Sequence, residues 1–484
     1  MLISNRGKKK DHHDFLAQID ELKQAYSYPI NADFRIREII NSEEKRIFVF
    51  YLGSIVDGNM LSETVLAPLE ESDFLFVPKE VSNREIKRVD TLQEAKKGIN
   101  NGYAFLLIGG ESTGFLINVA KFESRSVERA QNEITIKGPK EAFTESLQSN
   151  ISLIRKRMRS ESLITEEVPI NKNKTETAVL LYVKDIANEE VIQKVREQLS
   201  HIEADYIQSI EILEQYIEER PYSLFPSILY TERPDRAVFY LNEGHVVLLD
   251  QTSSACLILP ATFWSFFHSG EDHYLRFMYG NFGRLIRIVG LFITLFASAF
   301  YVAITTFHHE MVPTDLLLAI AAAREKVPFP VLIEVLIMEF SFELIREAGL
   351  RIPTPLGPTI GIVGALILGQ AAVQANIISP IIVIIVALSG LSSFTIAEIS
   401  LNYSIRLFRF IFILVTGVMG MYTLALVFIF FIFYLTSIKS FGVPFLSPLT
   451  PYYPSSQDTL FRKEIKKERW RPGFTLPKRL RKNE

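Results

Sequence analysis

The chain has 484 residues, a formal net charge of −3 and one cysteine. Its length allows two or three domains, and the small net charge gives no reason to expect a nucleic-acid partner. The single Cys256 excludes an intramolecular disulfide and belongs to no Cys/His framework, so no zinc site or other cofactor is predicted. No phosphate-binding loop, nucleophile elbow or zinc-protease motif occurs, so the sequence predicts no catalytic residue and no metal site.

The N-terminal half is rich in Lys, Glu and Asp, and residues 1–14 lack the apolar core of a signal peptide. We therefore expect this half to lie on the cytoplasmic side of a membrane. Residues 1–30 are predicted to be a flexible or helical lead-in. Two α/β lobes are expected to follow, at residues 31–160 and 161–275.

In the first lobe, the apolar run at residues 47–53 predicts a buried strand, and a helical pattern covers residues 60–69. Residues 103–108 and 114–119 predict two strands joined by a Gly-rich turn. Pro139 is expected to open an amphipathic helix that continues to about Arg159, because proline suits the first turn of a helix.

The second lobe is expected to contain a strand, two helices and a strand pair, at residues 178–183, 189–199, 207–218, 244–250 and 256–259. Residues 102–122 and 244–263 share one order of features: a glycine, an apolar strand, a polar turn, a second apolar strand and a Phe. This similarity is typical of two related lobes, although any two hairpins can look alike.

Long apolar runs predict an all-α membrane domain over residues 276–440. They occur at residues 286–307, 356–375, 377–397 and 410–437. About 20 apolar residues cross a bilayer core of roughly 30 Å. Arg276, Arg284 and Arg287 lie at the start of the first run, which places that end in the cytoplasm. Arg406 and Arg409 precede the last run.

Residues 331–345 are apolar but carry Glu334, Glu339 and Glu343. A carboxylate in hydrocarbon is costly, so we expect a re-entrant or interfacial helix rather than a lipid-facing span. The three carboxylates are candidate cation-interacting residues. The alternative is that they form ion pairs with nearby arginines: Arg324, Arg346 or Arg351.

Residues 441–484 are expected to form a basic cytoplasmic tail. From Phe461 onward there are ten Lys/Arg and three Asp/Glu, which places this end inside. With both ends inside, the number of spans is even. We expect about four spans plus the acidic helix, while five or six spans remain compatible with the sequence.

The apolar run at residues 356–375 carries two distinct stripes. Small residues recur every four positions and permit close helix packing: Gly357, Gly361, Ala365 and Gly369. A second face is polar at its ends and apolar in the middle, as in a pore with a dewetting constriction: Thr359, Val363, Leu366, Gln370 and Gln374. The alternative is a plain packed helix whose glutamines bond to its neighbours.

Several motifs recur along the chain in one family's order. They are residues 138–147 with Asn150 and 154–157, then 231–236, 328–330, 342–343 with 346–349, 360–366, 379–380 and 440–444. In these residues the chain resembles the A subunit of spore germination receptors, the GerA family of endospore-forming bacteria. The resemblance covers nearly the whole chain from about Asp33. Ala142, where the family usually has Gly, and Ala397, where it more often has Pro, depart from the pattern.

The resemblance implies a receptor of A, B and C subunits in the spore inner membrane, with the nutrient bound by the B subunit. It implies that the A subunit forms a homo-oligomer, a pentamer, that conducts monovalent cations. Contact with membrane lipid is expected separately, from Arg346, Glu347 and Arg351 near one membrane face. The two lobes and the tail then lie on the core side. No enzymatic activity is expected. The competing hypotheses are a non-conducting scaffold for downstream germination machinery and a related sporulation-stage membrane protein.

Overall fold

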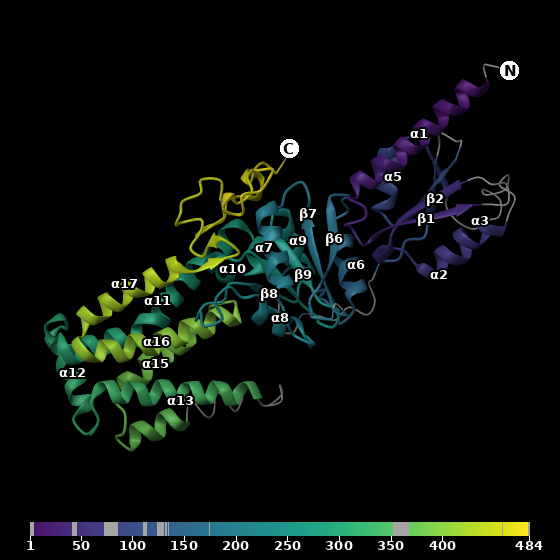
Figure 1. Cartoon of the computed structure of the whole chain (residues 1–484). Helices are drawn as coiled ribbons and strands as arrows, with labels where there is room; N and C mark the ends of the chain where they lie inside the picture. The colour runs from purple at the N-terminus through teal and green to yellow at the C-terminus, as the bar shows by residue number, and fades with distance from the viewer. Residues whose placement is uncertain are drawn as a thin grey trace.

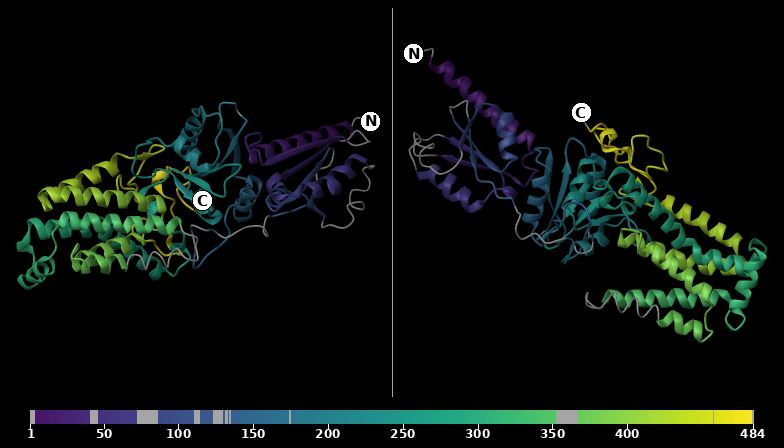
Figure 2. Two further views of the ribbon diagram at one scale, coloured as in Figure 1. Left: turned by 90° about the horizontal axis from the view of Figure 1, so that it is seen from below. Right: turned by 180° about the vertical axis from the view of Figure 1, so that it is seen from behind.

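The structure is a computed structural model in which two α/β lobes and a helical bundle follow one another (Figure 1). The bundle extends away from the second lobe, and the C-terminal segment returns to lie beside that lobe (Figure 2). The residues that the structure describes are 4–40, 46–71, 86–109, 114–122, 130, 133, 135–173, 175–351, 367–456 and 458–482.

The first lobe is built on a five-stranded antiparallel sheet in the order β1-β2-β4-β5-β3. Its strands are β1 (Phe34–Ile40), β2 (Arg46–Leu52), β3 (Ile86–Val89), β4 (Tyr103–Ile108) and β5 (Gly114–Asn118). They confirm the strands expected at residues 47–53, 103–108 and 114–119.

Helices cover both faces of this sheet. Helices α1 (Ser4–Ala25) and α5 (Leu92–Ile99) pack on one face, and α2 (Gly58–Leu61) and α3 (Ala67–Glu71) pack on the other. Because both faces are covered, β2 and β4 are continuous apolar runs. In α1, residues Phe15, Ile19 and Leu22 are buried at helical spacing, so this part of the N-terminal segment is a packed helix and not a flexible lead-in.

The second lobe has a five-stranded sheet in the order β6-β7-β9-β10-β8, again antiparallel throughout. Its strands are β6 (Leu163–Pro169), β7 (Thr177–Val183), β8 (Leu229–Thr231), β9 (Val246–Leu249) and β10 (Cys256–Leu259). Helices α7 (Glu189–Ser200) and α8 (Ile210–Ile217) cover one face, and α6 (Leu147–Arg157) and α9 (Pro234–Asn242) cover the other.

The two sheets share one topology, which confirms the similarity seen in the sequence. In chain order, both place the fourth and fifth strands between the second and the third. The similar hairpins are β4–β5 and β9–β10. Each follows a helix, and a glycine with positive φ lies between that helix and the hairpin, at Gly102 (+84°) and Gly244 (+92°). A Cβ on Gly102 would lie 2.9 Å from the carbonyl oxygen of Ile55, so both conformation and space require glycine there.

A buried ion pair joins the two lobes. Arg155 on α6 donates through Nε to Asp33 Oδ2 at 3.0 Å, and both side chains are almost fully buried. Asp33 also accepts from the backbone N–H of Ser54, at 2.7 Å. Arg155 donates to the carbonyl of Leu163 at 3.0 Å. The pair therefore fixes the start of the first sheet against the start of the second.

The expected helix from Pro139 begins later than predicted. Helix α6 begins at Leu147, with Ser146 as its N-cap. Before it, the backbone N–H of Phe143 donates to the carbonyl of Glu232 and that of Thr144 to the side chain of Asn150. These two bonds hold residues 143–144 in a non-helical path, which overrides the preference of Pro139.

The bundle contains the helices α11 (Phe277–Phe307), α12 (Thr314–Arg324), α13 (Val331–Arg351), α15 (Pro380–Ser393), α16 (Ile399–Met419) and α17 (Met421–Ser437). Helix α11 packs against α13, α15, α16 and α17. Among the described helices, α11 and α16 are long and apolar enough to cross a membrane, by length and composition. The number of spans stays a prediction.

The interpretation of residues 410–437 as one tilted span is wrong. The run is divided at Gly420, which ends α16 and precedes α17 with a φ of +66°. A Cβ there would meet Phe307 Cβ at 2.8 Å. Helix α16 begins at Ile399, so Arg406 and Arg409 lie inside it and do not precede it.

The acidic helix packs inside the bundle. Helix α13 contacts α11, α15 and α16, and Glu334 and Glu339 are fully buried. Protein therefore surrounds these two carboxylates, and a re-entrant or interfacial position of the helix stays a prediction.

The C-terminal segment is folded onto the second lobe. After α17 it forms the two-stranded β11 (Lys439–Ser440) and β12 (Val443–Pro444). Ser440 Oγ donates to the carbonyl of Ser227 at 2.6 Å, and Thr475 Oγ1 donates to that of Glu243 at 3.2 Å. The basic charges of this region therefore sit on an ordered layer and not on a free extension.

Arg155→Ala is expected to destabilise the protein by about 3–5 kcal/mol, because it leaves the Asp33 carboxylate buried without its partner. Urea unfolding of the full chain in detergent measures the loss. Arg159→Ala is the matched control, since Arg159 is exposed and its loss is expected to cost less than about 1 kcal/mol. Equal losses in the two variants would contradict the role of the buried pair.

Candidate functional site

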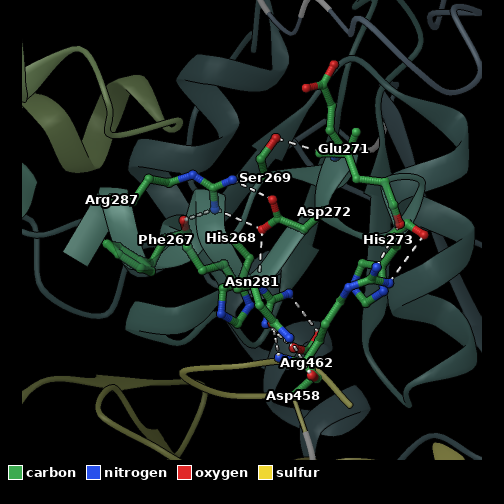
Figure 3. A network of polar contacts seen from close by, with 12 residues as sticks. Phe267, His268, Ser269, Glu271, Asp272, His273, Asn281, Arg287, Asp458 and Arg462 are labelled. Atoms are coloured by element: carbon green, nitrogen blue, oxygen red, sulfur yellow. Dashed lines mark hydrogen bonds and ion pairs between the residues drawn. The ribbon is translucent and has the colours of Figure 1, made fainter. Parts of the chain in front are cut away.

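Charged side chains from three segments meet where α11 leaves the second lobe (Figure 3). Asp272 lies in the short 3-10 helix Gly270–His273. Arg284 and Arg287 come from the first turns of α11, three residues apart and so on one face. Asp458 comes from the C-terminal segment. We call these four residues the junction cluster.

The Asp272 carboxylate is fully buried between the two arginines. Arg284 Nε donates to Asp272 Oδ2 at 3.1 Å, and Arg287 Nη1 donates to the same oxygen at 2.8 Å. Arg284 also pairs with Asp458, through Nη2 to Oδ2 at 3.2 Å. Two positive and two negative groups thus compensate one another, as buried charges require.

Further contacts close the C-terminal segment over the start of α11. The backbone N–H of Arg462 donates to Asn281 Oδ1 at 2.9 Å, and Arg462 Nη2 donates to the carbonyl of Leu275 at 2.7 Å. His268 Nε2 lies 2.5 Å from the carbonyl of Thr459, to which it donates. Lobe, helix and tail therefore form one packed junction.

The environment sets the charge state of this junction. Burial opposes ionisation of Asp458, but hydrogen bonds from His273 and Arg284 outweigh it and hold the pKa of that carboxyl well below its usual range. Burial likewise opposes ionisation of Asp272, and the hydrogen bond from Arg287 lowers the pKa of Asp272 overall. Burial lowers the pKa of His268 to about 4, with a contribution from Arg284. At neutral pH the two aspartates are therefore charged and His268 is neutral.

Two other bundle helices are also tied to the second lobe. Arg236 on α9 donates through Nη1 to Glu398 Oε2 at 3.3 Å, immediately before α16. The backbone N–H of Leu224 donates to Tyr434 Oη at 2.7 Å near the end of α17. A displacement of the second lobe would therefore act on α11, α16 and α17 together.

Inside the bundle, the three carboxylates predicted to interact with cations are paired with arginines. Glu334 lies 3.0 Å from Arg324. Arg409 Nη2 lies 3.0 Å from Glu339 and 2.6 Å from Glu343. These contacts favour the alternative left open by the sequence, that the carboxylates form ion pairs. The described residues contain no cluster of three or more His, Cys, Asp or Glu that would hold a metal ion.

The predicted pore-lining stripe falls mostly outside the described residues. This applies to Thr359, Val363 and Leu366, and to the packing positions Gly357, Gly361 and Ala365. Residues 367–374 are helical, with Gly369 buried and both Gln370 and Gln374 exposed. A Cβ on Gly369 would contact Val383 of α15 at 3.5 Å, so this position faces the bundle while the glutamines face outward.

Sequence reasoning missed the junction cluster. Arg284 and Arg287 were interpreted only as topology signals, and no role was predicted for Asp272 or Asp458. The arginines at i and i+3, preceded closely by an aspartate, carried a local signal for part of the cluster. Asp458 lies 174 residues from Arg284, and no pattern in the sequence connects them.

Asp458→Asn is expected to lower the free energy of unfolding at pH 7 by about 2 kcal/mol, the scale of a hydrogen bond to a charged group. Because the pKa of Asp458 is depressed in the folded state, its contribution is complete above the unfolded value of 3.8 and is lost as the pH falls below it. Urea titrations of the two proteins should therefore converge in acid. Asp205→Asn, at an exposed position, is the control and should match the wild type throughout.

Arg409→Met is expected to lower the apparent melting temperature in detergent, because Glu339 and Glu343 lose their shared partner. Adding Glu339→Gln removes one uncompensated charge and should restore part of the loss. A double variant no more stable than Arg409→Met would show that the charge of Glu339 is not balanced by Arg409.

The matching family model and two similar relatives are all spore germination proteins. A family model described as Bacillus/Clostridium GerA spore germination protein matches residues 20–474. The chain is 39% identical over 445 residues to Spore germination protein KA of Bacillus subtilis (strain 168), across 89% of this chain and 81% of that protein. It is 36% identical over 423 residues to Spore germination protein A1 of the same strain, across 87% and 88%.

Among solved structures, the chain is similar to the N-terminal domain of the A subunit of the Bacillus megaterium spore germinant receptor GerK3. The match covers 51% of this chain and 94% of that one, with 20% identity and a TM-score of 0.37. The family model and the two relatives confirm the resemblance seen in the motifs, and the chain belongs to the GerA family of spore germination proteins.

Proposed function

We propose that the chain is the A subunit of a nutrient-responsive spore germination receptor in the spore inner membrane. It assembles with B and C subunits and forms a homo-oligomer, a pentamer, that opens as a cation channel when nutrient binds to the receptor. The lobes and the C-terminal segment lie on the core side.

The observation that carries the channel proposal is the orientation of Gln370 and Gln374. Both side chains are exposed on the outside of the bundle, in a helix that packs through Gly369. Burying an amide in hydrocarbon without a partner costs roughly 2–7 kcal/mol. A single chain in lipid would leave both glutamines in that position. Neighbouring copies that turn this face toward a shared aqueous path remove the cost, which supports an oligomer with a central pore.

The junction supplies a route from ligand binding to this pore. The second lobe holds the start of α11, the start of α16 and the end of α17 through polar contacts. A partner subunit that displaces this lobe therefore shifts three helices together. This supports gating by movement of the lobe against the bundle.

The second candidate is a non-conducting scaffold that couples a nutrient-binding subunit to downstream germination machinery. It is favoured by the pairing of Glu334, Glu339 and Glu343 with arginines, because none of these carboxylates is then free to attract a cation. The two candidates differ in one measurable property, which is ion flux through the purified A subunit.

Val363→Ala and Gln370→Ala are expected to change potassium release from spores, because they widen the proposed constriction and alter a proposed mouth of the pore. Release before and after nutrient addition is measured against wild type, with Leu368→Ala as the control on a different face of the described helical segment that carries Gln370. Spontaneous or accelerated release is expected in the first two variants only. Normal nutrient-dependent release in both would move the pore elsewhere.

Potassium flux through the purified chain in liposomes distinguishes the two candidates. Wild-type liposomes that stay impermeable while Val363→Ala liposomes conduct would support a gated pore. Impermeable liposomes for every variant would favour the scaffold.

A further inference from the structure

A pocket lies between the second lobe and the C-terminal segment, with a cavity of about 70 Å³. Aromatic rings form much of its wall: Phe239, Tyr240, Trp264, Trp470 and Phe474. The chain has two tryptophans, and both line this pocket.

Four lining side chains each carry a buried polar atom with no hydrogen-bond partner among the described residues. These atoms are His245 Nε2, Trp264 Nε1, Ser456 Oγ and Glu468 Oε1. His245 is 1% exposed. Unpaired buried polar atoms are uncommon in folded proteins and costly, so four on one cavity indicate that something occupies it.

The hydrogen-bonding character of the four atoms follows from their chemistry and their surroundings. His245 donates through Nδ1 to the carbonyl of Tyr240 at 3.2 Å, so its Nε2 carries a lone pair and accepts. Burial lowers the pKa of His245 to about 3, which keeps the ring neutral. Glu468 Oε1 is a second acceptor, the indole N–H of Trp264 is a donor, and the Ser456 hydroxyl acts as either. The occupant must therefore donate at least two hydrogen bonds.

The charge of the wall also selects the occupant. Three carboxylates line the pocket, Glu243, Asp458 and Glu468. Asp458 is balanced by Arg284 in the junction cluster, so Glu243 and Glu468 face one lysine of the wall, Lys482. Lys482 lies 2.5 Å from Glu243 and 3.6 Å from Glu468. Aromatic faces beside excess carboxylate attract a cation through the ring quadrupole as well as by direct charge.

We propose that this pocket binds a small organic ammonium ion, whose N–H groups donate to His245 and Glu468 while its alkyl part contacts the aromatic rings. A cavity of about 150 Å³ holds a six-carbon ring, so one of about half that volume suits roughly three to five non-hydrogen atoms. Each buried water needs at least about 10–15 Å³, so the cavity has room for more than one water. An ammonium ion has no acceptor, so a water beside it accepts the indole N–H of Trp264.

The pocket lies next to the contacts that hold the start of α11. Asp458 and His268 line it, and both also belong to the contacts that hold the start of α11. An ion bound there lies next to that anchor. The binding proposal itself does not depend on conduction by the bundle.

The test is a titration of the purified full chain in detergent with ethylammonium chloride, read by intrinsic tryptophan fluorescence. Both reporters lie in the pocket, so occupancy changes the whole signal. We expect a saturable change with a Kd on the order of 1 mM, the scale allowed for a ligand this small. Sodium chloride at equal ionic strength and neutral n-propanol should give no saturable change.

Glu468→Gln keeps the shape of the side chain and both tryptophans, and it should raise the Kd at least about tenfold. Glu464→Gln is the matched control, because Glu464 is exposed, pairs with Lys467 and does not line the pocket. Circular dichroism establishes that both variants are folded. No saturable change in wild type would show that the pocket holds water only. An equal response to n-propanol, or equal weakening in the two variants, would also overturn the proposal.

Discussion

The buried carboxylate of Asp272 is the constraint on which the arrangement of lobe, bundle and tail depends. A carboxylate with no exposed surface must be paired, and Arg284 and Arg287 satisfy it only if α11 leaves the lobe in one direction and rotation. Arg284 is itself fully buried and requires a second anion, which Asp458 supplies. The return of the C-terminal segment is therefore part of the charge balance at the base of the bundle.

The two lobes share a topology but differ in how they connect to their neighbours. The first is joined to the second by a buried polar contact between Asp33 and Arg155. The second lobe is continuous with the bundle, because one hydrophobic cluster runs from Leu181 and Leu249 in its sheet to Phe412 and Leu435 in α16 and α17. Motions of the second lobe are therefore expected to be transmitted to the bundle.

Polar side chains in the bundle avoid the free-energy cost of contact with hydrocarbon in two different ways. The glutamates of α13 are neutralised inside the chain by arginines from α12 and α16. Gln370 and Gln374 face outward and require water or a neighbouring copy. The first arrangement holds one chain together, and the second is the reason to expect more than one chain.

The sequence alone determined the features whose signal is local. Continuous apolar runs predicted β2, β4 and β7 correctly. A strand that is buried on both faces is apolar along its whole length, and this signal lies entirely in the local sequence. The similarity of residues 102–122 and 244–263 predicted two related lobes, and the motifs that occur in the order of the GerA family predicted the family. The tertiary structure decided what depends on distant partners. Asn150 and Glu232 delay the helix expected at Pro139, and the close approach of Phe307 fits the break of residues 410–437 at Gly420. The junction cluster and the aromatic pocket combine residues about 200 positions apart, and such pairings arise only when the folded chain brings buried charges and rings together.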